Sequence, residues 1–135
     1  MSQIILSDEN CEGQANHIFR ILTYRGYTEL LSLELKMLPD VGLPRGVDDR
    51  TIWLHCQEHK YLLLTGNRTT TDGHESLEYA IQDLVTPTSL PVLTISNLKR
   101  IPRDSEYLIR CAERLADIVM YLEEYHLGTR RLYLT

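Results

Sequence analysis

Positive charge is scarce in this sequence: 14 Lys and Arg stand against 19 Asp and Glu, which gives a formal net charge of −5. Domains that bind nucleic acid through their overall charge are usually basic, so this balance argues against that mode of binding. The negative balance does not argue against a local basic patch beside an acidic site, because clustered acids that hold metal ions also make a chain negative.

Cysteines are few and scattered, and long apolar runs are missing. Cys11, Cys56 and Cys111 never form a Cys-x-x-Cys pair, which argues against a disulfide framework and a thiolate zinc site and favours buried apolar roles.

No apolar run approaches the roughly 20 residues that span a bilayer. The N-terminal residues lack the basic segment and small-residue cleavage site of a secretory signal. We therefore expect a cytoplasmic protein without a membrane segment.

Glycine-rich phosphate loops are also missing, since Gly66 and Gly73 stand alone and a nucleotide-binding loop needs several glycines at fixed spacing. A zinc metalloprotease is excluded as well. His55 and His59 are separated by Cys-Gln-Glu, so no glutamate directly follows the first histidine. Two histidines at this spacing can still chelate zinc on a helix, and this stays open as a minor alternative.

The chain does have a regular alternation of short apolar runs and helical patterns over 135 residues, of which 43% are hydrophobic and 24% charged. Continuous apolar runs are typical of buried parallel strands, and apolar residues three and four apart are typical of amphipathic helices. We predict strands from Gln3 onward and over Glu29–Leu35, Tyr61–Thr65, Val92–Ile95 and Arg130–Leu134, and helices over Gln14–Arg25, from Asp48-Asp49 onward, and over Glu75–Leu84 and Asp104–Tyr125. The sequence therefore predicts one α/β domain, residues 1–135, built as a three-layer sandwich around a mostly parallel central sheet of about five strands.

The first strand runs directly into Asp8, Glu9 and Asn10. In sheets of this kind the carboxyl ends of the strands form the ligand crevice, so these polar groups arrive where binding and catalysis usually occur. A purely structural alternative stays open, in which Asp-Glu-Asn ends the strand and caps the next helix.

Further oxygen ligands are expected at the same edge of the sheet. Asn67 follows the third strand, Asp72 lies in the loop after it, and Asp49 begins a helix that points to this edge. Carboxylates that converge on one place cannot all stay ionised and unpaired without a cation. Hard oxygen ligands suit Mg²⁺ or Mn²⁺. The sequence therefore predicts a metal site that includes Asp8 and Asp49, with Asn67 and Asp72 completing or orienting it.

Three basic residues, Lys99, Arg100 and Arg103, follow the fourth strand and should lie at the same edge. A net-acidic protein that acts on a polyanion needs such a local positive patch, and we take these residues as the candidate nucleic-acid contact. The alternative is a solvated loop. A phospho-acceptor receiver domain would share this architecture, but it needs an aspartate at the end of the third strand, where Leu64-Thr65-Gly66 offers none.

Three short motifs resemble those of small PIN-like proteins, members of the PIN-domain nuclease superfamily. They are Ile-Leu-Ser-Asp-Glu-Asn at the first strand, Asp49-x-x-Ile52 at the start of a helix, and Tyr-Leu-Leu-Leu-Thr-Gly-Asn-Arg at the third strand. The resemblance covers roughly residues 3–82, and the rest matches only by its predicted fold.

The resemblance implies a divalent-metal-dependent ribonuclease, possibly the toxin of a toxin–antitoxin pair with an antitoxin protein as partner and a homodimeric assembly. By it, Asp8 would be the first metal ligand and Asp49 the second acid. Where the family usually has an aspartate, two residues after the threonine of the third strand, this sequence has Asn67, and Asp72 could substitute for it. Because an amide adds no charge, the alternative is a catalytically weakened PIN-like module that binds RNA or a protein partner.

Overall fold

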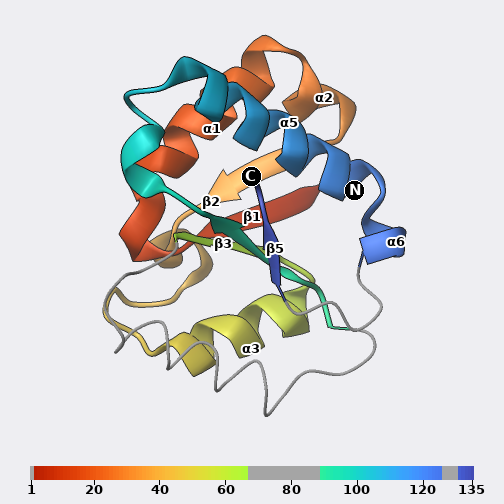
Figure 1. Cartoon of the computed structure of the whole chain (residues 1–135). Helices are drawn as coiled ribbons and strands as arrows, with labels where there is room; N and C mark the ends of the chain where they lie inside the picture. The colour runs from red at the N-terminus through yellow and green to blue at the C-terminus, as the bar shows by residue number, and fades with distance from the viewer. Residues whose placement is uncertain (1, 67–88, 126–130) are drawn as a thin grey trace.

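Five parallel strands form the centre of the computed structural model, which describes residues 2–66, 89–125 and 131–135. Every neighbouring pair in the sheet is parallel, and helices cover both faces (Figure 1). The predicted three-layer α/β sandwich is confirmed. The strands are β1 (Gln3–Ser7), β2 (Leu33–Lys36), β3 (Leu62–Gly66), β4 (Val92–Ile95) and β5 (Arg131–Tyr133).

The strand order is β2-β1-β3-β4-β5. The chain therefore moves from β1 to one side to form β2, and then crosses to the other side of β1 to form β3. The crossing point lies between β1 and β3, where Ser7 is in register with Leu64. In open α/β sheets, ligands bind outside the carboxyl ends of the strands at such a crossing point.

The helices lie in two layers. Figure 1 shows α1 (Glu12–Tyr24), α2 (Tyr27–Leu30) and α5 (Ser105–Met120) on one face of the sheet and α3 (Asp49–His59) on the other. In that view, β1, β2, β3 and β4 run towards the left, where α1, α3 and α5 begin. Short 3₁₀ turns complete the described chain at η1 (Glu9–Cys11), η2 (Leu38–Val41) and η3 (Leu98–Arg100), and α6 (Leu122–Tyr125) follows α5.

Side chains alternate between the two faces of the sheet, and this explains the continuous apolar runs. Ile5 and Leu64 belong to the core beneath α1 and α5, whereas Leu6 and Leu63 pack in a second core with Trp53 of α3. Successive strand residues point to opposite faces, so a strand buried on both faces must be apolar at every position.

Several predicted local features are confirmed. Gly26 ends α1 with φ of 82°, a left-handed conformation that glycine adopts without strain. Asp48 caps α3 by accepting a hydrogen bond from the backbone N–H of Thr51 at 2.7 Å. The three cysteines are free and buried. None of the described helices is both long and apolar enough to cross a membrane.

The predicted strand over Glu29–Leu35 is wrong in its first half. Tyr27–Leu30 forms the short helix α2, and the strand begins only at Leu33. The cause lies in two residues with positive φ: Gly26 turns the chain into α2, and Ser32, with φ of 52°, turns it out again. Leu30, which the strand pattern would bury, is 70% exposed.

The predicted long helix over Asp104–Tyr125 is interrupted. It ends at Met120, and α6 follows after Tyr121, which leaves helical geometry with ψ of 34°. The predicted basic loop contains the turn η3. The predicted helix Glu75–Leu84 and the first residue of the predicted last strand lie outside the described residues.

Candidate functional site

Asp8 lies at the carboxyl end of β1, beside the crossing point of the sheet. Its backbone N–H donates to the carbonyl oxygen of Leu64 on β3 at 2.9 Å, which continues the strand pairing by one residue. Its side chain is only 5% exposed, and Oδ1 accepts a hydrogen bond from the N–H of Glu9 at 2.7 Å. Asp8 therefore caps η1, so it has the capping role that the purely structural alternative predicted.

The second oxygen of Asp8 is held from the neighbouring strand. The Thr65 hydroxyl of β3 donates to Asp8 Oδ2 at 2.9 Å, and Thr65 itself is 2% exposed. One carboxylate is thus fixed by a backbone group on its own turn and by a side chain from the other side of the crossing point. A buried carboxylate must be hydrogen-bonded, and here its bonds also set its direction.

Asn10 joins the same pair of strands beyond the end of β1. Its Oδ1 accepts from the N–H of Gly66 at 3.2 Å, and its Nδ2 donates to the Gly66 carbonyl at 3.1 Å. One side-chain amide therefore replaces the partner strand that β3 loses where β1 ends. Only one orientation of the amide satisfies both bonds.

Gly66 also brings the basic turn close to this site. A Cβ atom at Gly66 would lie 2.4 Å from Cδ1 of Leu98 in η3, so the absence of a side chain lets the turn pack directly on the end of β3. The predicted placement of the basic residues at the same edge as Asp8 follows from this contact.

Within the basic turn, the three cations differ. Arg100 forms an ion pair with Asp104 at 2.6 Å, and its guanidinium lies 4.4 Å from the ring centroid of Tyr107. The hydrogen bond from Arg100 lowers the pKa of Asp104. Lys99 and Arg103 are exposed. They are the cations of this turn that extend into solvent, while Arg100 is anchored to the start of α5.

Two further acids beside Asp8 hold the chain around the edge. Glu9 Oε1 accepts from the N–H of Gly46 at 2.5 Å, and Glu12 forms an ion pair with Arg45 at 2.6 Å. The segment before α3 is thus tied to the start of α1.

The structure places Asp49 in the first turn of α3, half-buried and next to the capping residue Asp48. Hydrogen bonds from Thr51 lower the pKa of Asp48. Cys56, further along α3, lies near enough to Asp8 that the carboxylate adds to the effect of burial, which raises the pKa of this thiol to about 12. Burial likewise raises the pKa of Cys11 to about 12, so both thiols stay protonated at neutral pH.

The remaining predicted ligands cannot be placed. Asn67 and Asp72 lie outside the described residues. Within the parts of the chain that the structure describes, no group of three or more His, Cys, Asp and Glu residues is arranged to hold a metal ion. Of the predicted ligands, the described residues therefore include only Asp8 and Asp49, both at the carboxyl edge of the sheet.

The histidine pair lies elsewhere. His55 and His59 stack with ring centroids 4.2 Å apart in the second half of α3, and Nδ1 of His59 lies 3.0 Å from the carbonyl oxygen of His55. Burial and the neighbouring His59 lower the pKa of His55. Because α3 begins at the carboxyl edge of the sheet and runs away from it, this pair is separate from the Asp8 site.

Sequence reasoning placed Asn10 at the carboxyl edge but predicted no contact for it, and it assigned no role to Thr65. A signal for both was present, because parallel strands that neighbour each other bring the residues at their carboxyl ends together. The hydroxyl at the end of the third strand and the amide after the first strand were therefore candidates to interact. The order of the strands, which decides that β1 and β3 are neighbours, was needed to connect them.

The carboxyl edge thus combines a nearly buried carboxylate held by two donors, the N-terminal ends of α1, α3 and α5, and two exposed cations. Carboxylates already cap two of these helix ends, Asp48 on α3 and Asp104 on α5, whereas no side chain caps α1. The described edge thus has one nearly buried carboxylate and a basic turn close to each other. Comparison of the chain with protein-family models, curated proteins and solved structures finds no match.

Proposed function

We propose that this protein is a PIN-like ribonuclease that depends on Mg²⁺ or Mn²⁺ and acts at the carboxyl edge of its sheet. The observation that carries the proposal is the Asp8 carboxylate, 5% exposed and held by Glu9 and Thr65 at the crossing point of the strands. A cytoplasmic location and membership of a toxin–antitoxin pair belong to the same proposal.

The donor chemistry of the described edge is compatible with Mg²⁺ or Mn²⁺. Mg²⁺ keeps several of its waters and is commonly bound by only one or two carboxylates together with substrate phosphates. Asp8 and Asp49 would hold the ion, and Asn67 and Asp72 remain predicted ligands. When bound, the ion offsets charge on the scissile phosphate and lowers the pKa of a coordinated water.

The chain's own residues prepare this site. The Thr65 hydroxyl and the Glu9 N–H fix both oxygens of Asp8, so the carboxylate needs no reorientation when a cation or substrate arrives. Lys99 and Arg103 are exposed on the turn that packs on the end of β3, and they can bind the phosphates that flank the cleaved bond. The N-terminal end of α1, which no side chain caps, adds partial positive charge at the same edge.

The direct test of the proposal is cleavage of single-stranded RNA in the presence of Mn²⁺, with and without a chelator. We expect cleavage with Mn²⁺ that stops when the chelator is added, and binding of Mn²⁺ in calorimetry. If the purified protein binds no Mn²⁺ and cleaves no RNA in any divalent cation, the proposed activity is wrong.

A second candidate function is a weakened PIN-like module that binds RNA or a protein partner without cleaving RNA. Two observations favour it: the described residues assemble no cluster of three metal ligands, and Asn67 stands where the resembling family has an aspartate. RNA binding in gel shifts without Mn²⁺-dependent cleavage would support this function over the first.

The basic turn provides a prediction that both functions share when RNA is the ligand. Lys99→Glu and Arg103→Glu should each weaken RNA binding, because each removes a cation that can bind a phosphate. The salt slope of binding should fall by about one for every phosphate that the protein no longer neutralises. Fluorescence anisotropy at several salt concentrations measures both quantities.

Arg20→Glu is the matched control, because it makes the same charge change at an exposed position of α1. If all three variants bind RNA alike, the basic turn makes no phosphate contact. Affinity for Mn²⁺ should stay similar in all of them, since none of these residues is a proposed ligand.

A further inference from the structure

Three aromatic rings meet where α3 ends, at the end of this helix that is remote from Asp8. The rings of His55 and His59 stack with their centroids 4.2 Å apart. The ring of Tyr61, just before β3, has its centroid 5.7 Å from that of His55 and 5.4 Å from that of His59. We call these three residues the ring cluster. The cluster joins the last turns of α3 to the start of β3.

The two histidines differ in how their ring nitrogens are held. Nδ1 of His59 lies 3.0 Å from the carbonyl oxygen of His55, and because a carbonyl only accepts, this nitrogen carries a hydrogen. His59 can therefore bind a second proton at Nε2 without losing this bond. Nε2 of His55 is buried and has no hydrogen-bond partner among the described residues. A charged His55 ring carries N–H on both nitrogens, so it would keep a buried donor without an acceptor, which is costly.

The groups around His55 add to this cost. His59 would carry the same charge, and among the described residues Glu58 on the same helix is the group that acts in the opposite sense. From the strand side, Tyr61 contributes an uncharged ring. Burial, and after it the neighbouring His59, lower the pKa of His55. The stack therefore favours a neutral His55.

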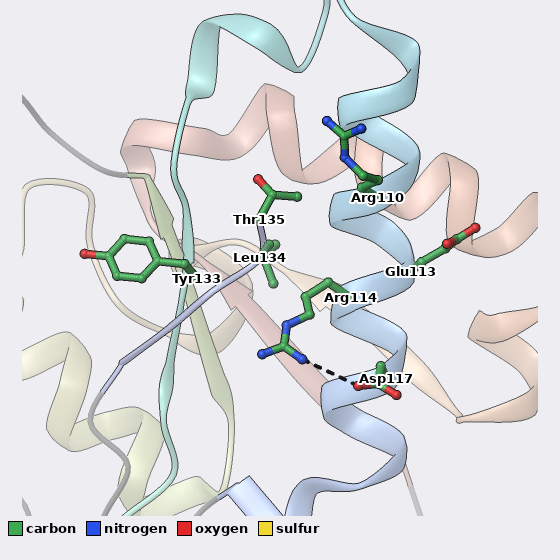
Figure 2. Close-up of a pocket in the computed structure, with 7 residues that line it drawn as sticks. All are labelled: Arg110, Glu113, Arg114, Asp117, Tyr133, Leu134 and Thr135. Carbon is green, nitrogen blue, oxygen red and sulfur yellow. Dashed lines mark ion pairs between the residues drawn. The ribbon is translucent and has the colours of Figure 1, made fainter.

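Two like groups in contact differ from the ion pairs that the chain forms elsewhere. On α5, Arg114 and Asp117 lie 3.6 Å apart, beside a groove that the last three residues of the chain also line (Figure 2). Opposite charges attract each other, whereas two imidazoles repel each other once both are protonated. Histidine is the side chain whose ordinary pKa lies between pH 5 and 8. The stack is therefore expected to respond to mild acid.

The last turn of α3 also holds the chain at two other places. The side chain of Gln57 accepts a hydrogen bond from the N–H of Leu90 at 2.8 Å and donates one to the carbonyl oxygen of Leu90 at 3.1 Å. Gln3 of β1 donates from Nε2 to the carbonyl oxygen of Lys60 at 3.1 Å, and Lys60 follows the helix with φ of 62°. The chain that enters β4 is thus attached to the same turn that the ring cluster covers.

We propose that the ring cluster is an acid-sensitive switch, which holds the last turn of α3 at neutral pH and releases it when both histidines are protonated. A charged His55 leaves the stack, because outside it the ring reaches water and moves away from His59. The bond between His59 and the carbonyl oxygen of His55 is lost in the same step. The proposal is independent of the proposed nuclease function, because none of its residues belongs to the Asp8 site.

The released segment is short. The residues of α3 up to Cys56 stay in place, because Ile52, Trp53 and Cys56 are buried in the second core. Opening therefore extends from Gln57 to Lys60 and frees the backbone that Gln57 holds. Local openings of this kind occur where few apolar groups are buried, and residues 58–60 are all exposed.

The direction of the pH dependence follows from the lowered pKa of His55. Its ordinary value is 6.5, and the released ring returns towards it, so the open state binds more protons than the closed state. The closed state is therefore favoured above this pH and is lost progressively as the pH falls through it. The ratio of charged to neutral histidine changes about tenfold per pH unit below the pKa, so opening should become up to about tenfold more frequent between pH 7.5 and 5.5.

Hydrogen exchange of the Leu90 and Lys60 amides, followed by NMR between pH 7.5 and 5.5, tests the proposal. After correction for the intrinsic effect of pH, the protection factors of both amides in the parent should fall by up to about tenfold. The amides of Leu63 and Leu64 in β3 should keep their protection, because the opening is local. In the same spectra the His55 ring should titrate below pH 6.5, and at higher pH in His59→Gln.

His55→Phe is the decisive variant, because it keeps an aromatic ring in the stack that binds no proton. Its Leu90 and Lys60 amides should change in protection by less than about twofold over the same pH range. His17→Phe makes the same substitution on α1 and should behave like the parent. If His55→Phe fails to fold, His55→Gln removes the titrating group in the same way.

Three results would overturn the proposal. In the first, the parent shows the same protection at pH 7.5 and 5.5. In the second, the variants at position 55 lose protection in acid as the parent does, so that another group must be the one that binds the proton. In the third, Leu63 and Leu90 lose protection equally, because the whole molecule would then open and not the last turn of α3.

Discussion

Replacing Asp8 by asparagine is expected to lower Mn²⁺-dependent RNA cleavage by at least about a hundredfold while the protein stays folded. Loss of a group that only supports a metal ligand costs roughly 10- to 100-fold in affinity or activity, so loss of a charged ligand should reach the upper end of that range. Single-turnover cleavage of a labelled RNA measures the effect, and calorimetry measures the accompanying loss of Mn²⁺ affinity.

The fold should tolerate this change, because asparagine is as good a helix cap as aspartate. Its amide oxygen can accept the hydrogen bond from Glu9 that Asp8 Oδ1 accepts now, and its amide nitrogen can donate to the Thr65 hydroxyl, which donates to Asp8 Oδ2 in the parent. The change removes a charge at nearly constant shape, so a loss of cleavage cannot be attributed to a collapsed site when circular dichroism and melting temperature stay close to the parent's.

Asp48→Asn is the control that separates ligation from capping. Asp48 caps α3 as Asp8 caps η1, lies at the same edge of the sheet, and is not a proposed ligand. Cleavage by this variant should remain within a few-fold of the parent. Full activity in Asp8→Asn, or an equal loss in both variants, would show that the Asp8 carboxylate does not hold the ion.

Leu64→Ala should lower the free energy of unfolding by about 2–5 kcal/mol, the cost typical of deleting a buried leucine side chain. Leu64 is fully buried in the core beneath α1 and α5. Its neighbours in that core belong to the sheet and to both helices, and they cannot all move into the space that the leucine side chain leaves. Lost apolar burial and the remaining cavity therefore both lower the free energy of unfolding. Urea denaturation measures the change.

Leu54→Ala is its counterpart on the surface. Leu54 lies on α3 and is 44% exposed, so the same truncation should change stability by about 0.5 kcal/mol or less. Equal effects of the two variants would mean that residue 64 is not in a packed core. The comparison thus tests whether Leu64 is packed in the core beneath α1 and α5.

The strands of this protein were predictable where apolar runs have clear ends. Val92–Ile95 was predicted with the bounds that the structure has, because Pro91 precedes it and Ser96 follows. The stretch Glu29–Leu35 was predicted as one strand and was wrong in its first half, since helix and strand patterns cannot be distinguished over so few residues. The backbone turns at Gly26 and Ser32 decide the outcome, and Ser32 carries no signal for positive φ.

The candidate site was predictable in position but not in its internal contacts. The polar residues after the first strand indicated the carboxyl edge, and Asp8 lies there. The roles of Thr65 and Asn10 depend on β1 and β3 being neighbours, and a sequence without known strand order does not specify this. Whether an ion binds between Asp8 and Asp49 stays a prediction, as do the roles of Asn67 and Asp72.

The crossing of the chain between β1 and β3 also has a consequence for the speed of folding. The hydrogen bond from Thr65 to Asp8 joins residues 57 apart in sequence, and those between Asn10 and Gly66 join residues 56 apart. Contacts at such separation require closure of a long loop before they contribute, which slows folding. The local unit from β1 through α1 to β2 can form earlier, but it lacks Thr65 and Gly66. The candidate site therefore comes into existence only when the third strand docks, in the same step that completes the centre of the sheet.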